Sequence, residues 1–172
     1  MKSKGAVFSD KELAALYKLI KESHEKAPQT EEDAHFLYYD EYEPLVDITM
    51  LSALLKKVGN MLDNKEKSSV DKDFLRMRYH SYNNDVDEKA YAVLEKAFEQ
   101  LKRVEIEYFN MESAEFVKRE IDVYYKSRKY IIGYCHFRKD IRKFRTSRIA
   151  SAKLTKEKYK IPKDFDKNDY YP

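Results

Sequence analysis

The chain has 172 residues and a formal net charge of +3, with 38% charged and 42% hydrophobic residues but only 3 Gly and 4 Pro. This composition excludes collagen-like chains and disordered chains rich in glycine or proline, and the length allows one ordinary domain or two small ones. No uncharged apolar stretch approaches the roughly 18 residues of a transmembrane helix, so no membrane span is expected.

The first 84 residues are predicted to form a helical region. Ser9 and Glu12 have the spacing of a capping box, and apolar residues recur at helical spacing behind them, which predicts a helix over residues 10–26. A second helix is predicted over residues 47–63 on the same criterion. About 20 residues separate the two helices, whereas a helix-turn-helix has a turn of about three or four residues, so this DNA-binding motif is not expected.

The other segments before residue 103 are interpreted from their composition. Residues 29–45 are acidic and aromatic and are interpreted as a loop or a short helix, residues 64–73 as a polar connection, and residues 74–79 as either strand or helix. Asp85 and Glu88 then have the pattern of another helix start, and the helix is expected to end near residue 102.

Beyond Arg103 the apolar residues alternate with polar ones, which is the spacing of strands. Because the links are short and closure removes exposed strand edges, we expect a small closed or nearly closed five-stranded barrel. The predicted strands are residues 104–109, 116–126, 129–137, 141–146 and 148–154. The fold class is therefore α+β.

The expected domain organisation follows from these elements. A helical region covers residues 1–84, a helix with a barrel covers residues 85–166, and residues 167–172 are a tail. The charged stretch from Thr155 onward is expected to be loosely ordered.

Positive charge gathers in the predicted barrel. Residues 101–172 contain 19 Lys and Arg against 11 Asp and Glu, and 12 basic but 3 acidic residues fall between Phe116 and Lys153. The first 100 residues are acidic overall. This asymmetry predicts an anionic partner for the C-terminal part, with attraction between the two halves of the chain as the alternative.

Residues 130–149 resemble a known family. The stretch YIIGYCHFR at 130–138, followed by RKFRTSRI at 142–149, resembles the WYL domain, in which a Trp-Tyr-Leu strand often continues into Tyr-Cys-His-Leu-Arg and precedes the pattern R-x-F-R-x-x-R-I. Lys129-Tyr130-Ile131 stands in place of the Trp-Tyr-Leu triplet, whereas the arginine pattern is intact. The resemblance extends over residues 86–166.

The resemblance implies an Sm-like or SH3-like barrel that acts as a ligand-sensing module. WYL domains are common in bacterial transcription regulators and phage-defence proteins, and some bind single-stranded nucleic acid or nucleotide signals. A winged helix-turn-helix usually precedes the barrel in this family. Because none is recognisable here, that DNA-binding part is absent, diverged or supplied by another chain.

A cluster of arginine and aromatic residues is the candidate site for an anionic ligand that carries bases. Arginine pairs with phosphate through two parallel hydrogen bonds, and aromatic rings offer stacking surfaces to bases. Strand alternation places Tyr134 and His136 on one face, and Cys135 and Phe137 on the face that suits the barrel interior. The residues expected to bind the ligand are Arg119, Tyr130, Tyr134, His136, Arg138, Arg142, Arg145 and Arg148.

Structural roles are the alternative for three of these residues. Arg148 could pair with an acidic side chain such as Asp122 or Asp140. Tyr130 could be a core or interface ring, and His136 could be an ordinary strand histidine. Both interpretations stay open for each residue.

Catalytic and metal sites are not expected. Cys135 and His136 are adjacent in a strand and point to opposite faces, so they do not form a nucleophile or a metal site together. The other histidines lack metal-ligand spacing, and there is no glycine-rich phosphate loop. We therefore expect no metal, no cofactor and no enzymatic activity.

The sequence favours a cytoplasmic regulatory protein whose barrel binds single-stranded nucleic acid or a nucleotide and controls transcription or a defence system. The N-terminus lacks the apolar core of a signal peptide, and the single cysteine cannot form an internal disulfide. The alternatives are a protein-interaction adaptor and an accessory subunit of a nucleic-acid-processing complex. A protein partner on the acidic N-terminal helices, and a homodimer through leftover apolar surface, also stay open.

Overall fold

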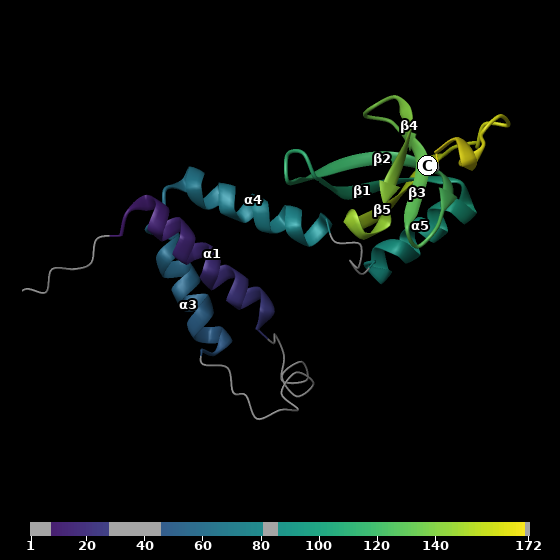
Figure 1. Cartoon of the computed structure of the whole chain (residues 1–172). Coiled ribbons are helices and arrows are strands. Elements are labelled where there is room, and N and C mark those ends of the chain that lie inside the picture. Colours follow the sequence, from purple (N-terminus) through teal and green to yellow (C-terminus); the bar gives the residue numbers. More distant parts are fainter. Residues whose placement is uncertain (1–7, 28–45, 81–85, 171–172) are drawn as a thin grey trace, which may run out of the picture. The chain divides into compact units, whose positions relative to one another are not determined.

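A computed structural model describes residues 8–27, 46–80 and 86–170, and shows an α+β fold (Figure 1). Helices come first in the chain, and a five-stranded antiparallel sheet follows. The helices in the described residues are α1 (Asp10–Lys26), α3 (Ile48–Gly59), α4 (Asn64–His80) and α5 (Glu88–Gln100). The strands are β1 (Lys102–Asn110), β2 (Glu115–Lys126), β3 (Tyr130–Cys135), β4 (Asp140–Arg145) and β5 (Ile149–Lys158).

The chain divides into two compact units, Met1–Asp71 and Lys72–Pro172. Their boundary falls inside α4, whereas the sequence-based boundary is at residue 84. The polar segment 64–73, expected to be a connection, is helical and belongs to α4, as does the ambiguous segment 74–79. The loop or short helix expected at residues 29–45 lies outside the described residues.

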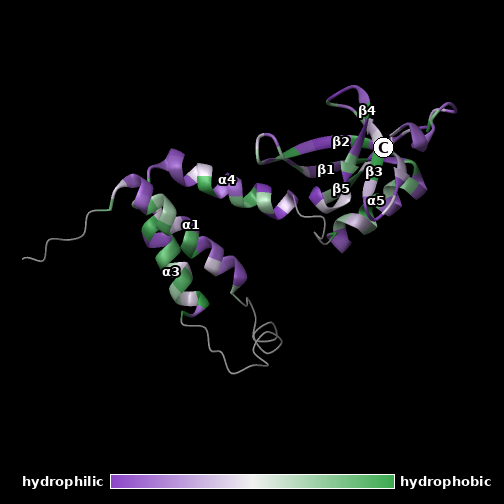
Figure 2. Cartoon of the chain, viewed as in Figure 1, coloured by the Kyte–Doolittle hydropathy of each residue, from purple (hydrophilic) through white to green (hydrophobic). Residues whose placement is uncertain are grey.

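The N-terminal unit is built on the pairing of α1 with α3. The capping box is confirmed, because the Ser9 side chain accepts from the Glu12 backbone N–H at 3.4 Å and Glu12 Oε2 accepts from the Ser9 N–H at 2.8 Å. Hydrophobic residues lie along the adjoining parts of these two helices, as the ribbon coloured by hydropathy shows (Figure 2). The buried residues of this core are Leu13, Tyr17, Ile20, Leu51, Val58 and Leu62.

The C-terminal unit packs α5 against the sheet. Asp87, whose side chain accepts from the Ala90 N–H at 2.8 Å, begins α5. The Asp85 cap expected from the sequence lies outside the described residues. Leu94 of α5 is fully buried against the sheet. The sheet contributes Val104, Ile106, Ile121, Val123, Ile131, Cys135, Phe144 and Ile149 to this core.

The sheet does not form a closed barrel, which was one of the two expected forms, closed or nearly closed. The strand order is β4-β3-β2-β1-β5, so β4 and β5 are the two edges of an open sheet. The sheet curls nevertheless, because only the short 3-10 helix η1 (Thr146–Arg148) joins these two edges. Tyr108 of β1 contacts the far edge, where its ring lies 5.2 Å from that of Phe144. The alternation of apolar and polar residues is the same in a curled open sheet and in a closed barrel, so the sequence pattern does not distinguish the two.

The C-terminal stretch is more ordered than expected. Strand β5 extends to Lys158, and the Tyr159 hydroxyl donates to the Val123 carbonyl of β2. The ring of Phe165 then lies 5.3 Å from that of Tyr124 and stacks on Tyr170. Aromatic contacts therefore fix residues 159–170 on β2. Across the described residues, no helix has the length and apolar character needed to cross a membrane.

Candidate functional site

The predicted site residues are divided between the two faces of the sheet. Residues opposite each other on neighbouring strands share a face. Arg142 pairs with Gly133, two residues from buried Phe144, and so lies on the face that carries the core. Arg119 lies on this core face as well, opposite Ile106. Tyr134 and His136 extend from the other face, the outer face, so the single cluster expected from the sequence is not formed.

Three of the predicted arginines gather around one hollow at the end of the core face. This arginine hollow has a volume of about 420 Å³. Buried Cys135 and Phe144 are apolar residues of its lining. The cationic residues that line it are Arg119, Arg138, Arg142 and Lys143, and its polar residues include Asn110 and Glu112.

The arginines of this hollow are only weakly neutralised. Arg142 Nε lies 3.3 Å from Asp140 Oδ2, but both side chains are more than half exposed, so solvent screens this pair. Among the described residues, no carboxylate lies within 4.0 Å of the guanidinium of Arg119 or Arg138. Guanidinium groups keep their charge at any physiological pH, so Arg119 and Arg138 offer an anion two charges that no described carboxylate pairs with.

Phe137 belongs to the site, although the sequence analysis placed its side chain in the interior of the barrel. Strand alternation predicted Phe137 in the interior, but β3 ends at Cys135 and the Phe137 side chain is 64% exposed. The Arg119 guanidinium lies 4.2 Å from the Phe137 ring centroid, and that of Arg138 lies 5.5 Å away. The chain turns directly after Cys135, because the Lys139 N–H donates to the Cys135 carbonyl at 2.7 Å.

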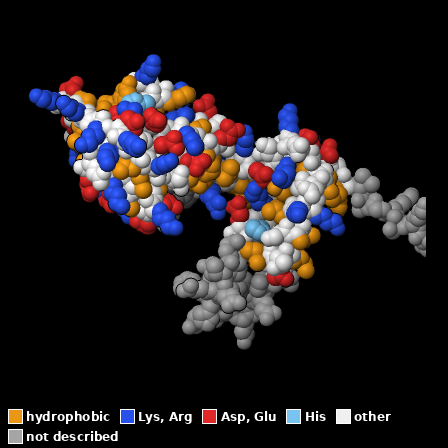
Figure 3. Space-filling model, turned by 180° about the vertical axis from the view of Figure 1, so that it is seen from behind, with side chains coloured by type: hydrophobic (Ala, Val, Ile, Leu, Met, Phe, Trp, Pro, Cys, Tyr) orange, Lys and Arg blue, Asp and Glu red, His pale blue; other side chains and the backbone are white. Residues whose placement is uncertain are grey.

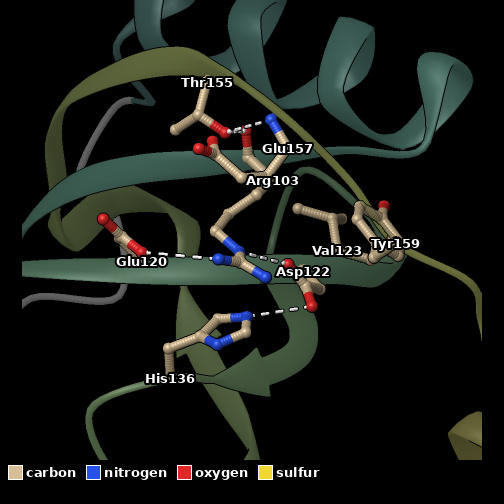
Figure 4. A network of polar contacts seen from close by, with 8 residues as sticks. All are labelled: Arg103, Glu120, Asp122, Val123, His136, Thr155, Glu157 and Tyr159. Atoms are coloured by element: carbon tan, nitrogen blue, oxygen red, sulfur yellow. Dashed lines mark hydrogen bonds and ion pairs between the residues drawn. The ribbon is translucent and has the colours of Figure 1, made fainter.

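His136 belongs to a polar network on the outer face (Figure 4). Its Nε2 lies 2.9 Å from Oδ2 of Asp122, and Arg103 Nε donates to Oδ1 of the same carboxylate at 3.0 Å. Asp122 is only 6% exposed, and a buried carboxylate requires such partners. Arg103 also lies 3.7 Å from Glu120. His136 is therefore held in place by a buried acid that the sequence had suggested only as a partner for Arg148.

The hydroxyl pKa of Tyr159 is affected by burial and by the Asp122 carboxylate of this network. Burial raises the pKa of the Tyr159 hydroxyl, and the negative charge of Asp122 raises it further. The neutral phenol is thus the form that the fold favours.

The remaining predicted residues lie away from the arginine hollow. Arg148 Nε donates to the Tyr79 carbonyl at 3.2 Å, so its structural partner is the end of α4 and neither of the two suggested aspartates. Tyr130 pairs with Arg145 across β3 and β4 on the outer face. The ammonium of Lys143 lies 4.9 Å from the Tyr130 ring centroid.

On the face seen in the space-filling view, charges of both signs are interspersed over the unit that contains the sheet (Figure 3). Within the part of the chain that is described, no group of three His, Cys, Asp or Glu side chains could hold a metal ion. The arginine hollow brings three arginines and Lys143 together at one place on this unit.

The WYL domain is the family whose model matches this chain, over residues 89–154. These residues form a WYL domain. The WYL domain begins in α5 and ends in β5, and it contains the three arginines of the hollow. No curated protein matches the chain.

Among solved structures, the chain is similar to proteasome accessory factor B/C (PafBC) of Arthrobacter aurescens. The two are 18% identical, with a TM-score of 0.36. The similarity covers 88% of this chain but only 21% of PafBC, so the chain spans about a fifth of the length of that protein.

Proposed function

We propose that this WYL-domain chain is a non-enzymatic regulatory protein that binds a single-stranded nucleic acid or a nucleotide in the arginine hollow. The observation that supports the proposal is the placement of Arg119, Arg138 and Arg142 around one hollow, two of them without a carboxylate partner among the described residues. Ligand occupancy would control transcription or a defence system.

The chemistry of the hollow suits a phosphate group. Each guanidinium can donate two parallel hydrogen bonds to phosphate oxygens, and three of them can surround one or two phosphates. Asn110 and Glu112 also line the hollow and supply acceptors for the N–H and O–H groups of a base or sugar. A ligand with phosphate on one side and hydrogen-bond donors on the other therefore fits this lining.

Fluorescence anisotropy with a labelled single-stranded oligonucleotide, at low and at moderate salt, tests this function. Arg119→Ala with Arg142→Ala should weaken binding about 100-fold, since each charged hydrogen-bonding group contributes about 1.5 kcal/mol or more. The magnitude of the log–log salt slope should fall by about 0.7 for each phosphate contact that is lost.

A matched control variant removes two positive charges from a part of the sheet outside the arginine hollow. Lys153 and Lys156 are exposed lysines of β5 that do not line the arginine hollow. Lys153→Ala with Lys156→Ala should leave the affinity nearly unchanged. Equal losses in both double variants would contradict a localised site, and tight binding of an acidic peptide without any oligonucleotide binding would favour the adaptor alternative.

A further inference from the structure

A second hollow, of about 290 Å³, borders the arginine hollow. It is lined by Glu105, Lys118, Arg119, Glu120, His136 and Phe137. Arg119 lines both hollows, and its guanidinium stacks on Phe137, which lines the second one. The pair of Arg119 and Phe137 is thus a wall between a hollow on the core face and a hollow on the outer face.

The second hollow differs from the first in its charge. Lys118 Nζ lies 3.7 Å from Glu105 Oε1, and Glu120 lies 3.7 Å from an arginine outside the hollow, so its acidic and basic groups compensate each other. Such a lining offers hydrogen-bond donors and acceptors without a strong anion field. It suits a base or a sugar better than a phosphate.

His136 gives the second hollow a hydrogen-bonding group of fixed orientation. A carboxylate only accepts hydrogen bonds, so the Nε2 that faces Asp122 carries a proton. The ring is held from its edge by the T-shaped contact with Tyr134 at 5.0 Å. Because Asp122 is itself held by Arg103, the imidazole cannot turn without breaking this network around a buried carboxylate.

We propose that the ligand crosses the wall, and that it is therefore an oligonucleotide of at least two nucleotides. A phosphate lies in the arginine hollow, the exposed ring of Phe137 stacks against a base, and the adjoining nucleoside occupies the second hollow beside Lys118 and His136. This inference rests on the function proposed above and specifies its ligand class. A mononucleotide would fill only the arginine hollow.

Competition binding with the full chain tests the inference, using deoxyadenosine 5′-monophosphate and 5′-phosphorylated d(A)2 and d(A)4 as probes. The dinucleotide should bind about tenfold more tightly than the mononucleotide, as expected for one added base stack. Phe137→Leu, which keeps an apolar side chain next to Arg119, and Lys118→Ala should each reduce this advantage. Lys118→Ala should also leave mononucleotide affinity unchanged, because Lys118 does not line the arginine hollow. Lys118 is 74% exposed, so its replacement leaves the fold intact.

Lys153→Ala is the matched control, because Lys153 pairs with Glu105 across β1 and β5 but does not line the second hollow. It should leave the preference for the dinucleotide intact. Equal affinity for all three probes, with Arg142→Ala still weakening each, would overturn the inference and leave the proposed function standing. Absence of binding, or binding indifferent to Arg142→Ala, would overturn both.

Discussion

Gly133 offers the sharpest test of the curled sheet that positions the arginine hollow. A Cβ atom at this position would lie 2.2 Å from the Asp122 carbonyl oxygen and 3.0 Å from the Asp122 carbonyl carbon. These are backbone atoms of the neighbouring strand, so no side-chain rotation can relieve the contact. A pairing irregularity follows directly, between Val123 and Tyr125. Gly133→Ala should therefore force β3 away from β2 where the sheet bends.

The magnitude follows from the distances. Carbon and oxygen atoms of adjacent strands approach to about 3.3 Å at closest, so the strands would separate by about 1 Å. Such overpacking costs about 1–3 kcal/mol, and each ladder hydrogen bond that is lost costs a further 0.5–1.5 kcal/mol or so. A total of about 3 kcal/mol should lower the unfolding temperature of a unit of about 100 residues by more than 10 °C.

Thermal unfolding followed by circular dichroism, together with hydrogen exchange measured on β2 and β3 peptides, would show this loss of stability in the unit Lys72–Pro172. Gly59→Ala is the control, because its Cβ would meet the flexible Lys67 side chain and the Tyr17 ring, each at 3.1 Å. The helix preference of alanine offsets this tightness, so the change should stay within about 1 kcal/mol. An unaltered unfolding temperature for Gly133→Ala would refute the close approach of β2 and β3.

Three further predictions concern contacts in both units. Burial and the hydrogen bond to Asp71 raise the pKa of Tyr17 to about 12. The free energy of unfolding of the N-terminal unit should therefore fall as the pH rises from about 10 to 12. Tyr17→Phe should reduce this fall in unfolding curves measured at alkaline pH. Arg148→Ala should cost about 1–2 kcal/mol in denaturant unfolding, through the lost bond to the Tyr79 carbonyl, and should leave oligonucleotide affinity unchanged. Asp87→Ala should cost about 1 kcal/mol by removing the cap of α5, and Asp87→Asn should retain most of the stability in the same thermal unfolding assay.

Local patterns in the sequence predicted the local structure well. The Ser9 capping box and the placement of Ile131 and Cys135 in the core are both confirmed, because capping and strand alternation involve neighbours in the chain. The interior position of Phe137 was wrong, because alternation carries no information on where a strand stops. The open sheet was equally beyond reach, since edge pairing depends on partners far along the chain.

The arrangement of the site could be predicted only in part. The motif from Tyr130 to Arg148 identified the WYL domain. The alternation of side chains along each strand did not reveal that Arg142 and His136 lie on different faces of the sheet. The network around Asp122 joins residues from β1, β2 and the turn after β3, and no short-range pattern connects them. Long-range register, rather than residue type, decides which cations share a hollow.

The most direct test of the central claim is a nuclear magnetic resonance titration of the arginine Nε–Hε signals with a 5′-phosphorylated single-stranded oligonucleotide. Anion binding in the arginine hollow predicts that the signals of Arg119, Arg138 and Arg142 shift together and saturate with one dissociation constant. The signal of Arg148, which bonds to the Tyr79 carbonyl and lines neither hollow, should stay in place. Uniform small shifts of all arginine signals, or shifts that leave those three unaffected, would contradict the account.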